Sequence, residues 1–285
     1  MSFRVGCFAL ITPFSNFKSQ LEIIHDMGVK YADVTDGNDG ASMAVEYGFG
    51  ASVSLDSNPF DIKRAFEEAS ITPTSYCAHA NLLDPPAPWR FSTPQILKAI
   101  RNAAAIGIKH VITTEGDPKT DFAESMTWDE KLFAIRERLY EPLRLAADMG
   151  VEILLEPHGE LTDSIRGLDA ILDACGAPDN LGINMDTGNS WLGGADPVEM
   201  TKHFISRIRH VHWKDLPAEM EEDRGKLYGC GMATIPLGEG VIDVAGVVKV
   251  LQDAGFEGDT TLEVAGVETM QASIEYLRSL EPNIG

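Results

Sequence analysis

The sequence predicts an α/β protein, a single (β/α)8 TIM barrel, from three observations. Short apolar runs rich in β-branched or aromatic residues alternate with longer segments of helical period, which is typical of parallel βαβ units. This alternation occurs eight times, with no linker or low-complexity segment between the units. The length of 285 residues suits one barrel, since such barrels commonly run to about 250 residues. We therefore expect residues 1–285 to form one domain.

The expected strands are short and follow one another at regular intervals. They are Arg4 to Leu10, Lys30 to Val34, Thr72 to Ala78, His110 to Thr114, Glu152 to Glu156, Leu181 to Asp186, Ile208 to His212 and Thr260 to Val264. Eight such units favour a closed barrel. The alternative, an open doubly wound sheet, lacks support because no GxGxxG motif for dinucleotide binding follows the first strand.

The segments between these strands have the apolar spacing of helices. They include QLEIIHDMG, DIKRAFEEA, QILKAIRNAAAIG, the run from Trp128 to Gly150, SIRGLDAILDACG, PVEMTKHFI, VAGVVKVLQDAG and TMQASIEYLRSL. Four helices are expected to end in a left-handed glycine, at Gly28, Gly107, Gly150 and Gly255. Two connections, 35–58 and 213–241, are too long for plain turns. Because each follows a strand and precedes a helix, we expect both to lie over the C-terminal mouth of the barrel.

Composition excludes several classes of partner. The net charge of -21 repels phosphate backbones and anionic lipid, so we expect neither nucleic acid nor a membrane surface as a partner. The four cysteines are far apart and form no CxxC pair, which indicates reduced thiols. The N-terminal apolar run is too weak for a signal peptide, and no stretch is long enough to span a bilayer. We expect a cytoplasmic protein.

The last four strands each end in a residue that can bind a metal ion. Glu156 ends ILLE, Asp186 ends LGINMD, His212 lies in RHVHWKD and Glu263 lies in TTLEVAG. One acid in such a place is often only a helix cap or a solvated residue. Carboxylates on adjacent strands, however, repel one another unless a cation lies between them. Three oxygens and one imidazole suit Mn2+ best, with Mg2+, Co2+ or Zn2+ as alternatives.

The motifs EPHG, DTGN, HVHWKD, LEV and PLGEGVID are found along the chain. With them, the sequence resembles the xylose isomerase-like superfamily of sugar phosphate isomerases and epimerases. Its members include ketose 3-epimerases, hydroxypyruvate isomerases and inosose dehydratases. The resemblance implies that Glu156 and Glu263 bind the metal and act as the acid/base pair, while Asp186 and His212 hold the ion. The reaction would be proton abstraction next to a carbonyl, through a metal-stabilised enediolate.

The sequence departs from the ketose epimerases at two places. Those enzymes often carry a histidine three residues after the aspartate of the sixth strand, and this chain has Asn189 there. They also often carry an arginine soon after the histidine of the seventh strand, where this chain has LPAEM. We expect substrate hydroxyls to be bound differently here, with Asn189 as a substrate-binding residue.

Five further residues are weaker candidates. His158 is expected to hydrogen-bond a substrate oxygen or to act as an additional acid/base, against the alternative of a loop histidine bonded to nearby backbone. Lys214 would neutralise a substrate oxyanion, although loop lysines are usually only solvated. His79 would contact the substrate or be a satisfied rim residue. Glu115 would line the pocket or orient a histidine, and Trp213 would stack on a sugar or pack under a lid.

Several functions agree with these features. The first is a metal-dependent isomerase or epimerase acting on a small carbohydrate or polyol. The second is a lyase or dehydratase that acts on a keto-inositol or a 3-keto-glycoside by β-elimination. An abasic-site endonuclease would need more histidines and a basic face, and a non-catalytic sugar-binding protein would not need both glutamates. A homo-oligomer is expected by resemblance alone.

Overall fold

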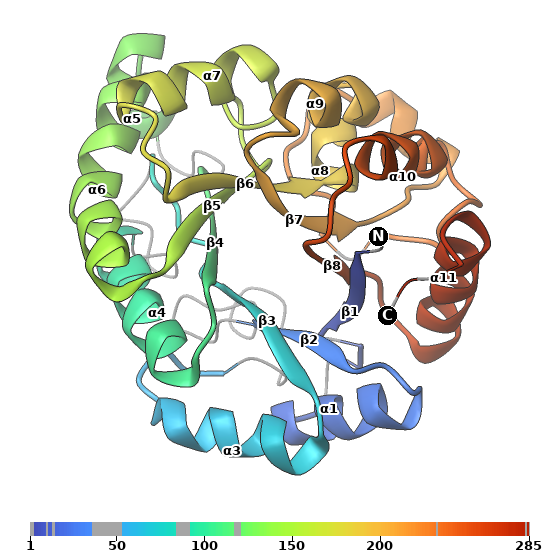
Figure 1. The fold of residues 1–285 in the computed structure, drawn as a ribbon. Helices are drawn as coiled ribbons and strands as arrows, with labels where there is room; N and C mark the ends of the chain where they lie inside the picture. Colours follow the sequence, from blue (N-terminus) through green and yellow to red (C-terminus); the bar gives the residue numbers. More distant parts are fainter. Residues whose placement is uncertain are drawn as a thin grey trace.

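Eight parallel strands close into a barrel, in the order in which they occur in the sequence (Figure 1). The computed structural model describes residues 3–9, 11–12, 15–35, 53–83, 92–116, 121–231, 233–282 and 284. The strands are β1 (Arg4–Phe8), β2 (Tyr31–Thr35), β3 (Thr72–Cys77), β4 (His110–Thr114), β5 (Glu152–Glu156), β6 (Leu181–Asp186), β7 (Ile208–Trp213) and β8 (Asp259–Leu262). Strand β8 pairs with β1, with Leu262 opposite Cys7, and this pairing closes the barrel. The predicted fold class is confirmed, and every expected strand is present.

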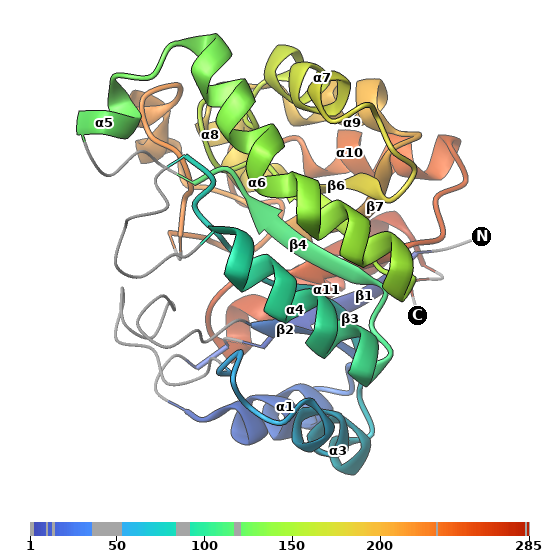
Figure 2. The same ribbon diagram turned by 90° about the vertical axis from the view of Figure 1, so that its left-hand side faces the viewer.

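Helices surround the barrel on its outside, and one helix or more follows each strand (Figures 1 and 2). They are α1 (Phe17–Asp26), α3 (Pro59–Ala69), α4 (Ser92–Ile106), α5 (Asp121–Glu124), α6 (Trp128–Met149), α7 (Ile165–Ala174), α8 (Thr187–Leu192), α9 (Pro197–Phe204), α10 (Val244–Asp253) and α11 (Val267–Leu280), with the 3-10 helix η1 (Ala218–Asp223) after β7. The short helices α5 and α8 were not expected from the helical period. Both are shorter than two turns, too short to show that period clearly.

Helix α6, the longest of those described, shows how local sequence sets the helix ends. Its first turn is closed by a capping box, in which the side chains of Thr127 and Glu130 each bond to the backbone of the other. It ends at Gly150, whose φ of 68° is left-handed and disfavours any residue with a Cβ atom. The other three predicted glycine caps also have positive φ, so the helix ends predicted from glycine are confirmed.

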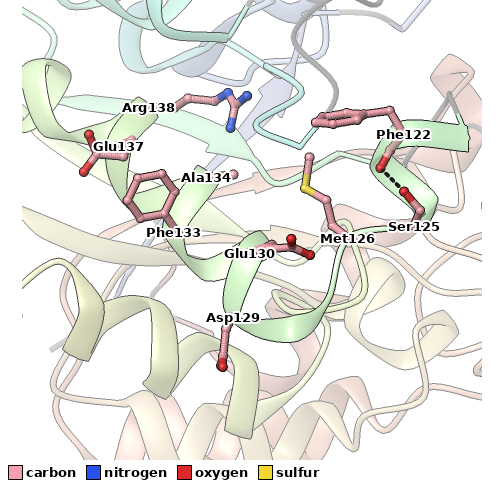
Figure 3. Close-up of a pocket in the computed structure, with 9 residues that line it drawn as sticks. All are labelled: Phe122, Ser125, Met126, Asp129, Glu130, Phe133, Ala134, Glu137 and Arg138. Carbon is pink, nitrogen blue, oxygen red and sulfur yellow. Dashed lines mark hydrogen bonds between the residues drawn. The ribbon is translucent and has the colours of Figure 1, made fainter.

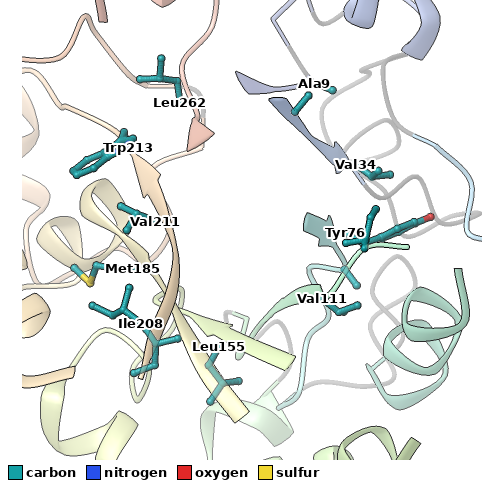
Figure 4. Packing of buried hydrophobic residues seen from close by; sticks show 14 of the residues in the cluster. Ala9, Val34, Tyr76, Val111, Leu155, Met185, Ile208, Val211, Trp213 and Leu262 are labelled. Atoms are coloured by element: carbon teal, nitrogen blue, oxygen red, sulfur yellow. The ribbon is translucent and has the colours of Figure 1, made fainter. Parts of the chain in front are cut away.

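The hydrophobic core lies between the strands and the helices (Figure 4). Along β7, His210 and His212 alternate with Val211 and Trp213, and alternate residues of a strand point to opposite faces. The indole of Trp213 is fully buried, with its ring centre 6.0 Å from that of Phe3. The outer face of the strand is therefore apolar, and the two histidines point into the barrel.

The two predicted long connections differ in what the structure describes. Of 35–58, residues 36–52 lie outside the described part of the chain. The connection after β7 contains η1 and then a loop, 235–242, which is held against the end of β7 by the carboxylate of Asp215. Among the described helices, none combines the length and the apolar character that crossing a bilayer would demand.

Candidate metal centre

The four predicted ligands meet at the C-terminal ends of β5 to β8. Glu156 and Asp186 are the last residues of β5 and β6, and Glu263 directly follows β8. His212 lies opposite Asp186 in the β6–β7 pairing. One ligand atom from each of the four lies within 4.8 Å of the others, and all four side chains are buried. The barrel therefore brings together residues that are up to 107 positions apart in the sequence, from Glu156 to Glu263.

The ring of His212 is turned so that Nδ1 faces the carboxylates. Nδ1 lies 3.0 Å from Glu263 Oε2, 3.2 Å from Glu156 Oε2 and 3.9 Å from Asp186 Oδ2. On the other side of the ring, Nε2 lies 3.0 Å from Oδ2 of the buried Asp33. A hydrogen bond from the second ring nitrogen to a carboxylate is what commonly orients a metal-binding histidine.

Asp33, in β2, is a functional candidate that the sequence reasoning missed. It also accepts a hydrogen bond from the hydroxyl of Thr74. Burial tends to raise the pKa of Asp33, but the charges and hydrogen bonds of His210 and His212 outweigh it and hold the pKa well below its ordinary value. The signal was a carboxylate inside the apolar run YADVT, because a charge in a buried strand requires a partner.

Asp186 has two separate roles, one for each oxygen. Oδ1 accepts a hydrogen bond of 2.7 Å from the backbone N–H of Asn189 and caps α8. Oδ2 points to the other ligands and lies 2.9 Å from Nζ of Lys214. The simple interpretation of this acid as a helix cap is therefore correct, and it is compatible with metal binding.

Amide side chains orient Glu156. Asn189 Nδ2 donates to Oε1 at 3.1 Å, and Asn184 Nδ2 donates to Oε2 at 2.9 Å. Asn184 is in turn 3.0 Å from Nδ1 of His210, which lies one layer deeper in the barrel. Both carboxylate oxygens of Glu156 are thus held in place by neutral groups that leave its charge intact.

The cluster holds buried charges of both signs. Burial raises the pKa of Asp186 to about 7, and the nearby carboxylates add to this effect. Burial acts in the same direction on Glu156 and Glu263, but His212 and Lys214 hold the pKa of both glutamates below the ordinary value. Burial would lower the pKa of the two cations, and the surrounding carboxylates instead hold it well above the ordinary value. An imidazolium and an ammonium therefore face two ionised glutamates and the carboxyl group of Asp186, which is partly protonated near pH 7.

The donor set suits a divalent ion. Three of its atoms, Asp186 Oδ2, His212 Nδ1 and Glu263 Oε2, are buried and make no well-formed hydrogen bond to the described residues. Buried polar atoms without such a bond are rare and often mark a place for an ion or a ligand. Three carboxylates and one imidazole can coordinate a divalent ion, and the ion would take over the positive charge now carried by the proton on His212.

Of the predicted substrate-binding residues, His79, Asn189 and Lys214 lie at this cluster. His79 Nε2 is 3.7 Å from Glu156 Oε2, and Lys214 Nζ is 3.0 Å from Glu263 Oε2. Both side chains are almost completely buried. The structure therefore brings a second histidine and a lysine to the two glutamates.

Three other predicted residues are not part of the four-residue ligand group. Glu115 lies beneath the loop between β5 and α7, where its carboxylate accepts backbone hydrogen bonds of 2.9 Å from Leu161 and 2.8 Å from Thr162. His158, half-buried in the same loop, packs against Gly229, where a Cβ atom would collide with its ring. Trp213 points away from the mouth into the core because it is adjacent to His212 along β7. This placement contradicts the expected contact between Trp213 and a substrate.

Comparison with known proteins agrees with the fold. The family described as xylose isomerase-like TIM barrel matches residues 17–280. An inosose dehydratase of Lacticaseibacillus casei is 29% identical over 168 residues, which cover 56% of this chain and 54% of the relative. The chain thus matches about half the length of the curated relatives.

Solved structures resemble this chain over nearly its whole length. A D-tagatose 3-epimerase-like protein has a TM-score of 0.75 and 20% identity, covering 98% of this chain and 97% of the other. The IOLI protein, solved with a bound zinc atom, has a TM-score of 0.74 and 18% identity, covering 98% of both chains. At such identities the likeness concerns the fold. With the family match over most of its length, the chain belongs to the xylose isomerase-like TIM-barrel family.

Proposed function

We propose that this protein is a divalent-metal-dependent isomerase or epimerase that moves a proton at the carbon next to a carbonyl of a small carbohydrate or polyol. The observation that carries this proposal is the pair formed by Glu156 and Glu263. Their carboxylates lie 3.2 Å and 3.0 Å from the same imidazole nitrogen of His212. Both have a pKa held below the ordinary value, so both are ionised and able to accept a proton.

Glu156, Asp186, His212 and Glu263 would hold the ion, which we propose to be Mn2+. When bound, a divalent ion acts as a Lewis acid that polarises a carbonyl and so acidifies the adjacent carbon. The acid/base work is then left to the glutamates. One carboxylate takes the proton from the carbon, and the other returns a proton to the same or to the neighbouring carbon.

Lys214, Asn189 and His79 would bind the oxygens of the substrate. Lys214 Nζ lies 3.0 Å from Glu263 and 3.3 Å from Asn189 Oδ1, so its ammonium group is next to one of the two bases. A positive charge there stabilises an oxyanion that develops during proton abstraction. His79 lies next to the other base, Glu156, and offers a second hydrogen-bonding group.

A lyase or dehydratase that acts on a keto-inositol or a 3-keto-glycoside is the second candidate. The observation that favours it is the sequence similarity to inosose dehydratases. The first step is the same for both candidates, because removal of the proton next to the carbonyl also precedes β-elimination. The candidates differ only in the next step, in which the carbanion either regains a proton or expels a leaving group.

The experiment that tests these proposals combines metal analysis with a substrate panel in deuterated water. The purified protein, loaded with Mn2+, is incubated with ketoses, a keto-inositol and 3-keto-glycosides, and the products are followed by NMR and mass spectrometry. An isomerase or epimerase incorporates deuterium and yields an isomer, whereas a lyase releases water from the keto-inositol or an aglycone from the 3-keto-glycoside. Failure of every substrate to exchange its proton, or failure of the protein to bind a divalent ion, would contradict both.

Glu263→Gln separates catalysis from mere sugar binding. Loss of one acid/base group is expected to lower turnover by about 100-fold or more, while a non-catalytic binding protein would retain its affinity and have no turnover to lose. Glu268→Gln is the matched control, since Glu268 is an exposed glutamate in the first turn of α11. Turnover of the control should equal that of the wild type.

A further inference from the structure

The outer face of α6 carries large apolar side chains that are exposed to solvent. Phe133 is 63% exposed and Tyr140 is 54% exposed, and Phe122 in the adjacent α5 is 65% exposed. Helix α6 lies on the outside of the barrel and runs across the front in Figure 2. Apolar side chains gathered in this way often mark a surface that another protein covers.

Two open hollows lie along this face. The first, which we call the acidic hollow, has a volume of about 720 Å3 and contains Phe122, Met126 and Phe133 together with three acids (Figure 3). The acids are Asp129, Glu130 and Glu137, and the basic residue in this hollow is Arg138.

The second, the basic hollow, has a volume of about 470 Å3 and is lined by the C-terminal half of α6 and the end of α7. It contains Tyr140 and Leu143 with the arginines Arg136 and Arg144, and its described lining includes no acid. Each hollow therefore offers apolar side chains, and the charges around the two hollows are mainly of opposite sign.

We propose that this face binds a second copy of the chain, with the two α6 helices antiparallel across a twofold axis between Arg136 and Glu137. A twofold interface pairs each residue with a partner at the same distance on the other side of the axis. Arg136 then faces Glu137 of the second copy. Phe133, three residues before Arg136, faces Tyr140, three residues after Glu137.

The same pairing extends one turn further in both directions. Asp129, seven residues before Arg136, faces Arg144, seven residues after Glu137. All the paired residues are exposed, and on each side of the axis they are spaced by three and four residues, which places them on one side of the helix. The acidic hollow of one copy thus covers the basic hollow of the other, and each receives an aromatic ring from its partner.

The charges on this face favour a second copy of the chain as the protein that binds there. Two chains with a net charge of -21 repel each other, so contact requires a place where opposite charges meet. Arg144 already pairs with Glu141 at 3.2 Å, but both side chains are more than 60% exposed, and such pairs contribute little. A stable interface buries about 800 Å2 on each partner, so the sides of both hollows, including Phe122 and the end of α7, must take part.

The test is the mass of the full chain in solution, measured by sedimentation velocity over a range of concentrations. The wild type is expected to be a dimer or a multiple of one. Phe133→Glu should abolish this contact and halve the mass. Phe60→Glu is the matched control, because Phe60 is 54% exposed but lies on α3, and it should leave the mass unchanged.

A charge exchange tests the register itself. Arg136→Glu sets two carboxylates against each other at both contacts across the axis and should dissociate the dimer. Glu137→Arg should do the same by placing two guanidinium groups together. The double variant restores both opposite-charge pairs and should recover the dimer. A wild type that is monomeric throughout, or an assembly that survives both Phe133→Glu and Arg136→Glu, would overturn the proposal.

Discussion

His212 donates a hydrogen bond of 3.0 Å from Nε2 to the carboxylate of Asp33, a residue 179 positions earlier in the chain. Asp33 is ionised, since its pKa is held well below the ordinary value, so it can only accept. This bond keeps one proton of the imidazolium on Nε2. Loss of the other proton, as metal binding requires, would leave the lone pair of Nδ1 facing Glu156, Asp186 and Glu263.

Replacing Asp33 by asparagine should weaken metal binding. The amide preserves the size of the side chain but removes its negative charge. In the wild type this charge orients His212 and makes the imidazole more basic. Loss of such a partner typically costs about 10- to 100-fold in metal affinity. Competition with a chelator of known affinity measures the change. Thr74→Val, which removes only the hydroxyl that donates to Asp33, should have a smaller effect, and an unchanged affinity in Asp33→Asn would refute the assigned role.

Metal removal should lower the unfolding temperature. An ion that binds only the folded state stabilises it by about 2.7 kcal/mol when present at about 100 times its dissociation constant. We expect Mn2+ to raise the unfolding temperature and a chelator to reverse the rise, as followed by calorimetry. Asp186→Asn should abolish the rise in unfolding temperature because it neutralises one ligand. Asp148→Asn should preserve the rise, since Asp148 is an exposed residue at the end of α6. The same increase in both variants would argue against the site.

The pH dependence of stability should report on Glu115. Burial raises the pKa of Glu115 from its ordinary 4.5 to about 7, although the hydrogen bonds from Thr162 and Leu161 oppose this. The folded state therefore holds a proton that the unfolded state loses above pH 4.5. This contribution to stability is complete below pH 4.5 and is lost as the pH rises through about 7.

From about pH 5 to about pH 8, the stability of the wild type should accordingly fall relative to Glu115→Gln, by up to about 3 kcal/mol. Denaturant unfolding of both proteins at the two pH values gives this difference. Glu257→Gln, the same substitution at an exposed position, is the matched control. A difference between wild type and Glu115→Gln that does not change with pH would show that the carboxyl of Glu115 titrates alike in the folded and unfolded states.

We expect the carboxylate of Asp215 to hold the loop 235–242 in place. Its carboxylate accepts hydrogen bonds from the backbone N–H groups of Gly238, Gly240 and Ile242, at 2.9 to 3.1 Å. Asp215→Ala leaves these groups without their acceptor and should cost about 3 kcal/mol of unfolding free energy or more. Asp243→Ala, which removes the cap of α10, should cost only about 1 kcal/mol. Denaturant unfolding and proteolysis within the loop distinguish the two, and equal losses would contradict the assignment.

The alternation of strands and helices and the identity of the four ligand candidates could be predicted from the sequence because both are local properties. Each strand has its own apolar run, and each of the four ligands stands at the end of such a run. Parallel strands in a barrel end at one mouth, so the convergence of these ends follows from the fold class alone. The place of Trp213 in the core could also have been predicted, since it alternates with His212 along one strand.

Only the tertiary structure decided the contacts across the barrel and around it. The bond between Asp33 and His212 depends on how β2 and β7 face each other when the barrel closes, and nothing near either residue specifies that distance. The same holds for Glu115, whose partners Leu161 and Thr162 lie on a loop 46 and 47 positions away. The sequence by itself determined which residues were available at the mouth of the barrel. Closure and register decided their partners, because a strand sets the direction of its side chains but not the residue that each one meets.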